Sequence, residues 1–187
     1  RVSPWSGWRL GGVPNLFAGP PITCAVNPCV GRECELSPAA EKKRVTVVGG
    51  GPGGLYAAWA CAVRGHQVTL VEKASELGGN FRIAAYPTGK GQLTEAIRSM
   101  IVKCRQAGVD LRCGVEADEM LLRSLAPDAI ILATGSTPLI LPIPGLSDCG
   151  YVTAQDMLDG KAPMGKSVLV VGGGMVGCEA AAYLADR

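Results

Sequence analysis

The stretch VVGGGPGGLYAAWACAVRGHQVTLVEK, residues 47–73, decides the fold. A run of β-branched residues leads into Gly49, Gly51 and Gly54, which have GxGxxG spacing. In such a turn the first glycine permits a tight bend, the second lets a pyrophosphate approach the backbone, and the third lets the following helix pack against the strand. The unpaired N–H groups at the start of that helix can then bind phosphate oxygens. The stretch predicts the strand, turn and helix of a dinucleotide-binding unit.

The surroundings of the turn strengthen this prediction, because glycine spacing alone is a weak signal in a chain with 26 glycines. A merely structural glycine turn is the alternative. Glu72 follows a second apolar run, residues 68–71, and a carboxylate at that strand end can accept hydrogen bonds from a ribose diol. The strand before the turn, the helix after it and Glu72 together favour dinucleotide binding.

Working outward, apolar runs and helical patterns alternate along the chain. Strands are predicted at residues 45–48, 68–71, 129–132 and 168–171, and helices at 55–63 and 93–107. The second helix should bury one face, formed by Leu93, Ile97, Ile101 and Val102. This alternation predicts a Rossmann-like parallel α/β sheet with helices on both faces.

The motif is written a second time in VLVVGGGMVGCEAAAYLADR, residues 168–187, with Gly172, Gly174 and Gly177 in the same spacing. We therefore predict two units: residues 44–150 as the first dinucleotide-binding unit and 151–187 as the start of a second. Residues 1–43 are rich in proline and glycine, which predicts a linker. Cys61 and Cys178, on the helices after the two turns, are predicted to be small buried residues.

Composition excludes several classes of function. Of 187 residues, 48% are apolar and 18% charged, and the net charge of +2 is scattered, which argues against nucleic acid or an anionic membrane as a partner. No apolar run is long enough to span a bilayer. The sequence shows no export signal, so a cytoplasmic enzyme with a small-molecule substrate is expected. No pattern predicts an oligomeric state.

Two further motifs identify the kind of dinucleotide. ELGGN at residues 76–80 directly follows the Glu72 region, and ATGSTP at 133–138 closes a later strand. The set resembles the flavoprotein superfamily with two dinucleotide-binding domains, in which the first glycine motif holds the ADP half of FAD and the second binds NAD(P)H. The resemblance implies cofactor contacts at Gly79, Thr134 and Gly135.

A narrower resemblance comes from PITCAVNPCVGRE at residues 21–33 and LGGNFRIAAYPTGK at 77–90. Both are similar to the family of 2,4-dienoyl-CoA reductase, 2-enoate reductase and trimethylamine dehydrogenase. There the cysteine before VNP, here Cys24, is a ligand of a [4Fe–4S] cluster. The resemblance implies electron transfer from NAD(P)H to FAD, then through the cluster to FMN in an old-yellow-enzyme-like barrel, where an activated C=C bond is reduced.

The chain also departs from this family. Residues 1–23 contain no cysteine, so the chain does not supply the other three thiolates of a four-cysteine cluster. No barrel is present, so we name no catalytic residue and expect the chain to be a fragment. A pyridine nucleotide-disulfide reductase is disfavoured, because no cysteine pair closely follows Glu72, although a pair in the second domain, as in thioredoxin reductases, stays open. Binding of ADP alone, as a structural ligand, stays open, and so does the choice between NAD and NADP.

Overall fold

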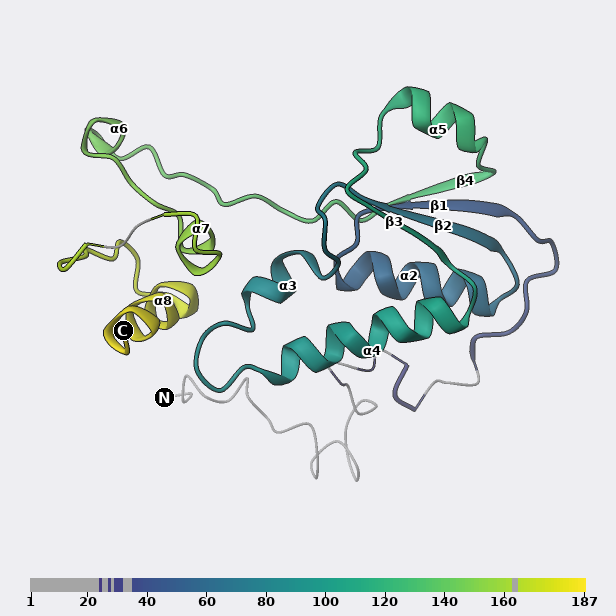
Figure 1. Ribbon diagram of the computed structural model, residues 1–187, viewed down its shortest axis with the longest axis horizontal. Helices are drawn as coiled ribbons and strands as arrows, with labels where there is room; N and C mark the ends of the chain where they lie inside the picture. Colours follow the sequence, from purple (N-terminus) through teal and green to yellow (C-terminus); the bar gives the residue numbers. More distant parts are fainter. Residues whose placement is uncertain (1–23, 25–26, 28, 32–34, 163–164) are drawn as a thin grey trace, which may run out of the picture.

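A four-stranded parallel sheet forms the centre of the first unit in this computed structural model, which describes residues 24, 27, 29–31, 35–162 and 165–187. Its strands are β1 (Arg44–Val48), β2 (Gln67–Glu72), β3 (Asp110–Cys113) and β4 (Ala129–Leu132), in the order β3-β2-β1-β4 (Figure 1). The register pairs Val45 with Val68 and with Ala129. The predicted Rossmann-like fold class is confirmed.

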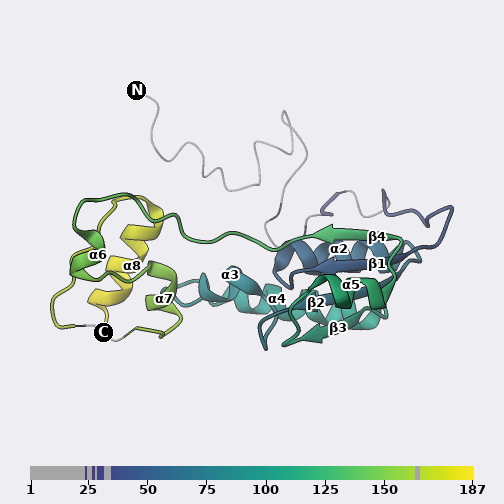
Figure 2. The ribbon, with the colours of Figure 1, turned by 90° about the horizontal axis from the view of Figure 1, so that it is seen from above.

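The helices are α2 (Pro52–Val63), α3 (Gly79–Ile83), α4 (Gln92–Gln106), α5 (Glu119–Leu125), α6 (Leu146–Cys149), α7 (Ala154–Leu158) and α8 (Met175–Ala185). Helices α2 and α4 cover one face of the sheet, and α5 lies on the opposite side (Figure 1). After β4 an extended segment leads away from the sheet to α6, α7 and α8, which group together at the other end of the molecule (Figure 2). None of the helices in the described part of the chain is long and apolar enough to span a membrane.

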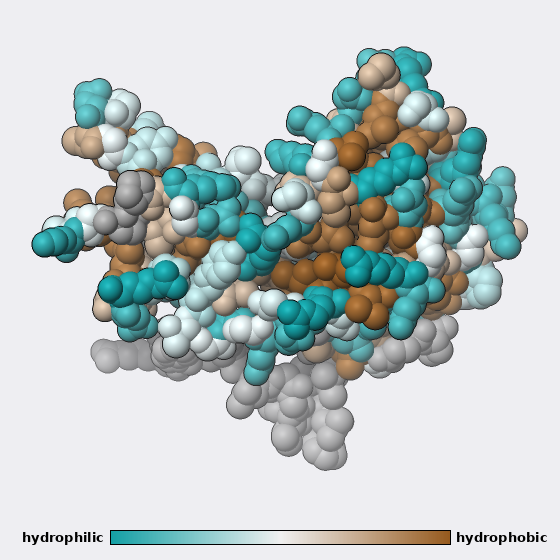
Figure 3. Space-filling view, viewed as in Figure 1, coloured by the Kyte–Doolittle hydropathy of each residue, from teal (hydrophilic) through white to brown (hydrophobic). Residues whose placement is uncertain are grey.

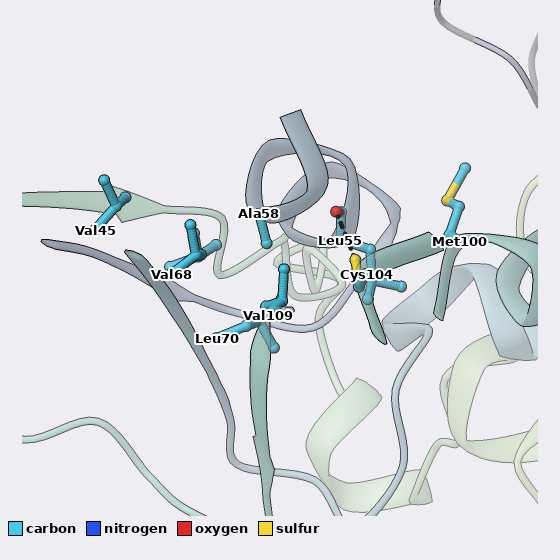
Figure 4. Packing of buried hydrophobic residues seen from close by; sticks show 9 residues of the cluster. Val45, Leu55, Ala58, Val68, Leu70, Met100, Cys104 and Val109 are labelled. Carbon is cyan, nitrogen blue, oxygen red and sulfur yellow. Dashed lines mark hydrogen bonds between the residues drawn. The ribbon is translucent and has the colours of Figure 1, made fainter. Parts of the chain in front are cut away.

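The hydrophobic core fills the space between β1, β2, α2 and α4 (Figure 4). Its buried members are Val45, Val47, Leu55, Ala58, Val68, Leu70, Met100, Cys104 and Val109. The other face of the two central strands is also covered, since Thr46 is 2% exposed and Val71 is 1% exposed. Inside the core the Cys104 thiol donates to the Leu55 carbonyl, and burial raises its pKa to about 11. The central strands are therefore enclosed on both faces, as their continuous apolar sequence predicts.

Apolar side chains also remain at the surface of both units, and Figure 3 shows part of this hydrophobic surface over the first unit. On the outer strand β4, Ile130 is 45% exposed and Leu132 is 75% exposed. In the second unit, Leu169 is 88% exposed. The core of the first unit is thus closed around β1 and β2, whereas β4 and the second unit are not enclosed by the described residues.

Two expectations from the sequence are wrong. Residues 168–171 lie inside the described range 165–187 but form no strand, because no neighbouring strand there offers backbone partners. In α4 the buried face is Ala96, Ile97, Met100 and Cys104, while Val102 is 44% exposed. Burying Ile97 and Cys104 on one face turns Val102 away from the sheet.

Candidate dinucleotide-binding site

Gly49 and Gly54 close the first glycine turn tightly. Gly49 has a φ of +110°, and its N–H donates to the Val71 carbonyl at 2.8 Å. A Cβ on Gly49 would collide with the carbonyl oxygen of Ala133, the residue after β4. A Cβ on Gly54 would collide with the Gly49 carbonyl oxygen. Neither position has room for a side chain, which agrees with the predicted roles in turning the chain and packing the helix.

Gly51 differs from both, because the space beside it is open. No heavy atom of the described residues lies within 4 Å of the position that a Cβ on Gly51 would occupy. Gly51 is also the N-cap of α2, in an extended conformation, and no side chain caps this helix end. Its first N–H groups are therefore available to an anion. The turn fits a pyrophosphate at the glycine where the sequence predicts one.

Glu72 holds the turn against the end of β2. Its Oε2 accepts a hydrogen bond from the Gly50 N–H at 2.6 Å, and its Oε1 accepts from the Ala74 N–H at 2.8 Å. Each carboxylate oxygen has a second lone pair, so both remain able to accept from ribose hydroxyls. Glu72 thus has a structural role that the sequence did not predict, beside its predicted binding role.

Gly50 is a site residue that sequence reasoning missed. A Cβ there would lie 2.5 Å from a methyl carbon of Leu77 and 3.0 Å from Cβ of Glu72. The signal was available, because three consecutive glycines leave a middle residue that the GxGxxG pattern does not explain. Gly78 also contacts the turn, because its N–H donates to the Gly50 carbonyl at 2.8 Å.

The ELGGN and ATGSTP segments meet beside this turn, at the carboxyl edge of the sheet. Gly79 has a φ of +51°, and a Cβ on it would lie 3.3 Å from the Gly51 Cα. Thr134 and Gly135 follow Ala133, the first residue after β4, and are exposed. Asn80, a residue that the sequence did not single out, donates from Nδ2 to the Ser136 carbonyl at 3.2 Å and so ties the two segments together. The structure brings the predicted residues of the first site to one edge.

The second turn repeats the backbone of the first without its surroundings. Gly172 has a φ of +111°, Gly174 is the extended N-cap of α8, and a Cβ on Gly177 would collide with the Gly172 carbonyl oxygen. No described heavy atom lies within 4 Å of a Cβ on Gly172. Glu179 on α8 forms an ion pair with Lys90 of the first unit, with 2.5 Å between Oε1 and Nζ.

Polar contacts join the two units. Asp159, after α7, pairs with Arg82 of α3 at 2.8 Å and with Lys161 at 2.9 Å. The hydrogen bond from Lys161, together with the Arg82 guanidinium, lowers the pKa of the Asp159 carboxyl below its ordinary value. The Thr88 hydroxyl also hydrogen-bonds Asp186 at 3.2 Å.

The predicted cluster ligand, Cys24, is exposed, and its sulfur accepts from the Asn27 N–H at 3.4 Å. Cys29 is buried, with its sulfur 2.7 Å from the Tyr56 hydroxyl oxygen, while Cys34 lies outside the described residues. Among the residues that the structure describes, no three His, Cys, Asp or Glu side chains come together to hold a metal. These residues do not fit a four-thiolate cluster, and a ligand role for Cys24 stays a prediction.

Known proteins resemble this chain in sequence. Residues 43–187 match the family described as pyridine nucleotide-disulphide oxidoreductase. An NADH oxidase of Thermoanaerobacter brockii is 43% identical over 92% of this chain and 28% of its own length. A cinnamate reductase of Clostridium sporogenes is 39% identical over 89% of this chain and 25% of its own length. The chain spans about a quarter of the length of these relatives.

Solved structures resemble it as well. The structure of 2-naphthoyl-CoA reductase aligns with a TM-score of 0.85 and 33% identity, covering 94% of this chain and 27% of that one. The resemblance to the enoate reductase group that the linker and ELGGN motifs predict is thereby confirmed. The match over residues 43–187, with the glycine turn geometry, shows that the chain belongs to the pyridine nucleotide-disulphide oxidoreductase family.

Proposed function

We propose that this chain is the electron-input part of a larger NAD(P)H-dependent flavoprotein oxidoreductase, with FAD at the first glycine turn and NAD(P)H at the second. One observation carries the proposal: Gly51 is open on its Cβ side, while Gly49 and Gly54 on either side are closed by backbone. At the second glycine of such a turn, the absence of a side chain lets a pyrophosphate approach the backbone. An uncapped helix N-terminus at the same residue suits a pyrophosphate.

Different residues of the first site would hold different parts of the cofactor. Gly51 and the first N–H groups of α2 would hold the pyrophosphate, and the free lone pairs of Glu72 would accept from the adenosine ribose. Gly79, Thr134 and Gly135 would line the path toward the flavin. FAD, when bound, supplies a ring that accepts a hydride from a reduced nicotinamide.

Gly172, Gly174 and Gly177 would hold NAD(P)H in the same manner, because their backbone repeats that of the first turn. This binding depends on neighbours that the described residues do not provide, since residues 168–171 are exposed and unpaired. The residue that would select NAD or NADP is placed by the strand that follows α8 in such units, beyond Arg187.

The names of the relatives support an activated C=C bond as the final electron acceptor. Cinnamate and 2-naphthoyl-CoA, named in two of them, both carry unsaturated carbons conjugated to a carbonyl group. FMN and a [4Fe–4S] cluster belong to this proposal for the whole protein through the family resemblance. Among the described residues, Cys24 would be the cluster ligand. The other ligands of the cluster and the FMN site would belong to the rest of the protein.

The test is cofactor analysis of the full-length protein that contains this chain. We expect a visible flavin spectrum, release of FAD on denaturation, and bleaching of the flavin by NADH or NADPH without oxygen. Release of ADP instead of FAD would support a structural ligand, and release of neither would contradict the proposal.

A matched pair of variants tests the site itself. Gly51→Val places its Cβ in open space, so the protein should fold but lose FAD. Gly91→Val adds the same side chain at the N-cap of α4, where a Cβ also meets nothing within 4 Å, and it should keep FAD. Retention of FAD by Gly51→Val would contradict the placement of the pyrophosphate.

A further inference from the structure

The short helix α3 lies between the sheet of the first unit and the helices of the second (Figures 1 and 2). At its N-terminal end, Gly78 donates to the first turn through the Gly50 carbonyl, and Gly79 lies beside Gly51. Along its length, α3 packs against α7. Helix α3 therefore contacts both the first turn and the second unit.

Asn80 of α3 forms hydrogen bonds with the segment after β4 and with the second unit. Its Nδ2 donates to the Ser136 carbonyl at 3.2 Å, and its Oδ1 accepts from Gln155 Nε2 of α7 at 2.7 Å. These partners lie 56 and 75 residues further along the chain. Arg82 also binds the second unit, through Asp159, but the hydrogen bonds of Asn80 additionally include the segment after β4 that carries Thr134 and Gly135.

We propose that Asn80 is a positioning residue that couples occupancy of the first nucleotide site to the placement of the second unit. This inference rests on the proposed function. Hydride transfer between nucleotides on the two turns requires the reacting atoms within about 3.5 Å of each other. The covalent link between the units is an extended segment of mostly exposed residues, 134–145, so their relative placement depends on noncovalent contacts. Two of these contacts are the hydrogen bonds of Asn80, which directly follows Gly79 in the chain.

The first test measures coupling without turnover. In the full-length protein stripped of FAD, amide hydrogen exchange is followed at residues 49–54 and 154–158 before and after FAD is added. We expect FAD to protect both segments in the wild type. In Asn80→Ala the turn should still be protected, whereas α7 should gain no protection.

The second test is anaerobic stopped-flow reduction of the FAD-loaded protein by saturating NADH or NADPH. A small misplacement of reacting groups costs about tenfold to a hundredfold in rate. Asn80→Ala and Gln155→Ala should each slow flavin reduction by about that factor and leave FAD content and the Kd for NAD(P)H within about twofold. The double variant should be no slower than the slower single variant, because both remove the same contact. Gln106→Ala, an exposed amide at the far end of α4, is the control.

The outcomes separate this inference from the proposed function. A wild type that binds no FAD, or whose flavin neither NADH nor NADPH reduces, overturns the proposed function. A wild type that behaves as expected, beside an Asn80→Ala variant with unchanged reduction rate and unchanged α7 protection, overturns only the role of Asn80. Loss of FAD from Asn80→Ala would instead make Asn80 part of the first site and would also overturn the positioning role.

Discussion

The two glycine turns have the same local geometry and very different surroundings. The first glycines have φ values of +110° and +111°, and in both turns the third glycine faces the carbonyl of the first. In the preceding segments, Val45 is 5% exposed where Val168 is 47% exposed. Val47 is fully buried where Val170 is 36% exposed. The glycine spacing is therefore sufficient for the backbone of the turn, while burial depends on neighbours distant in sequence.

The helices that follow the turns show the same difference. Leu55, the residue after the third glycine of the first turn, is fully buried against β1 and β2. Cys178 occupies the same place after the second turn and is exposed, contrary to the expectation that it is buried. Cys61, on the first of these helices, is partly buried, and burial raises the pKa of its thiol.

The largest expected effect comes from placing the same methyl group in both turns. Gly54→Ala should destabilise the first unit by about 3 kcal/mol, because the Gly49 backbone is fixed between β2 and Ala133 and cannot shift. Gly177→Ala should cost less than about 1 kcal/mol, since no described atom packs against the Cβ position of Gly172 and its backbone can yield. Urea denaturation of the 187-residue chain, with hydrogen exchange at α2 and α8, measures both. Equal losses would mean that the surroundings of the turn are unimportant.

Truncating the paired valines should give the next largest difference. Val47→Ala removes two buried methyl groups from the core and should cost about 2 kcal/mol. Val170 is 36% exposed, so Val170→Ala should cost about 0.5 kcal/mol or less. The same urea titration reports both values. A cost above 1 kcal/mol for Val170→Ala would show that residues 168–171 are buried in solution.

Removing Glu72 makes the first turn more like the second, for which no described carboxylate accepts from a glycine N–H. Glu72→Ala removes the acceptor for Gly50 and Ala74 and the expected ribose contact. FAD affinity should fall at least tenfold, or about 1.4 kcal/mol, because hydrogen bonds to charged groups are the stronger ones. Fluorescence titration with FAD measures this, and Glu72→Gln, which keeps one acceptor oxygen, should lose less. Unchanged affinity in Glu72→Ala would refute the assignment.

The smallest effect concerns the contact that holds the second unit. Because the pKa of Asp159 is lowered in the folded protein, its contribution to stability is complete above the ordinary pKa of about 3.9 and is lost as pH falls through the folded pKa. Asp159→Asn should cost under about 1 kcal/mol at neutral pH. NMR amide signals of α7 should shift with acid in the wild type and shift less in the variant. Asp110→Asn, on exposed β3, is the control. An identical acid response in all three proteins would show that Asp159 is not the group whose protonation shifts the α7 signals.

Much of the first unit could be predicted from sequence because its signals are local. The run at residues 129–132 has the bounds of β4, and the predicted β1, β2 and α4 are within one residue at each end. These elements combine continuous apolar residues or helical periodicity with a glycine boundary. The packing roles of Gly49 and Gly54 were predictable for the same reason, since each follows from its own backbone position, while the binding role of Gly51 stays a prediction.

The missed features depend on contacts that no local pattern records. Strand β3 has the sequence DLRC, only four residues of mixed polarity, and it is a strand because β2 offers it an edge. Asn80 gained its place from partners far along the chain. Helix α5 could have been predicted, because an aspartate before an apolar run is a helix start signal. In the structure the Asp118 carboxylate accepts from the Leu121 N–H at 2.7 Å.

The contact between Gly49 and Ala133 has a consequence for the order in which this unit folds during synthesis. The edge of β4 is joined to β1 where the Arg44 N–H donates to Asp128, 84 residues later in the chain. Closing so long a loop has an entropic cost that local elements do not have, and such pairings form slowly. When β1, the glycine turn and α2 have left the ribosome, β4 has not yet been made, so the turn still lacks its contact with Ala133. The first turn therefore reaches its described packing only after β4 has emerged, late in the synthesis of this unit.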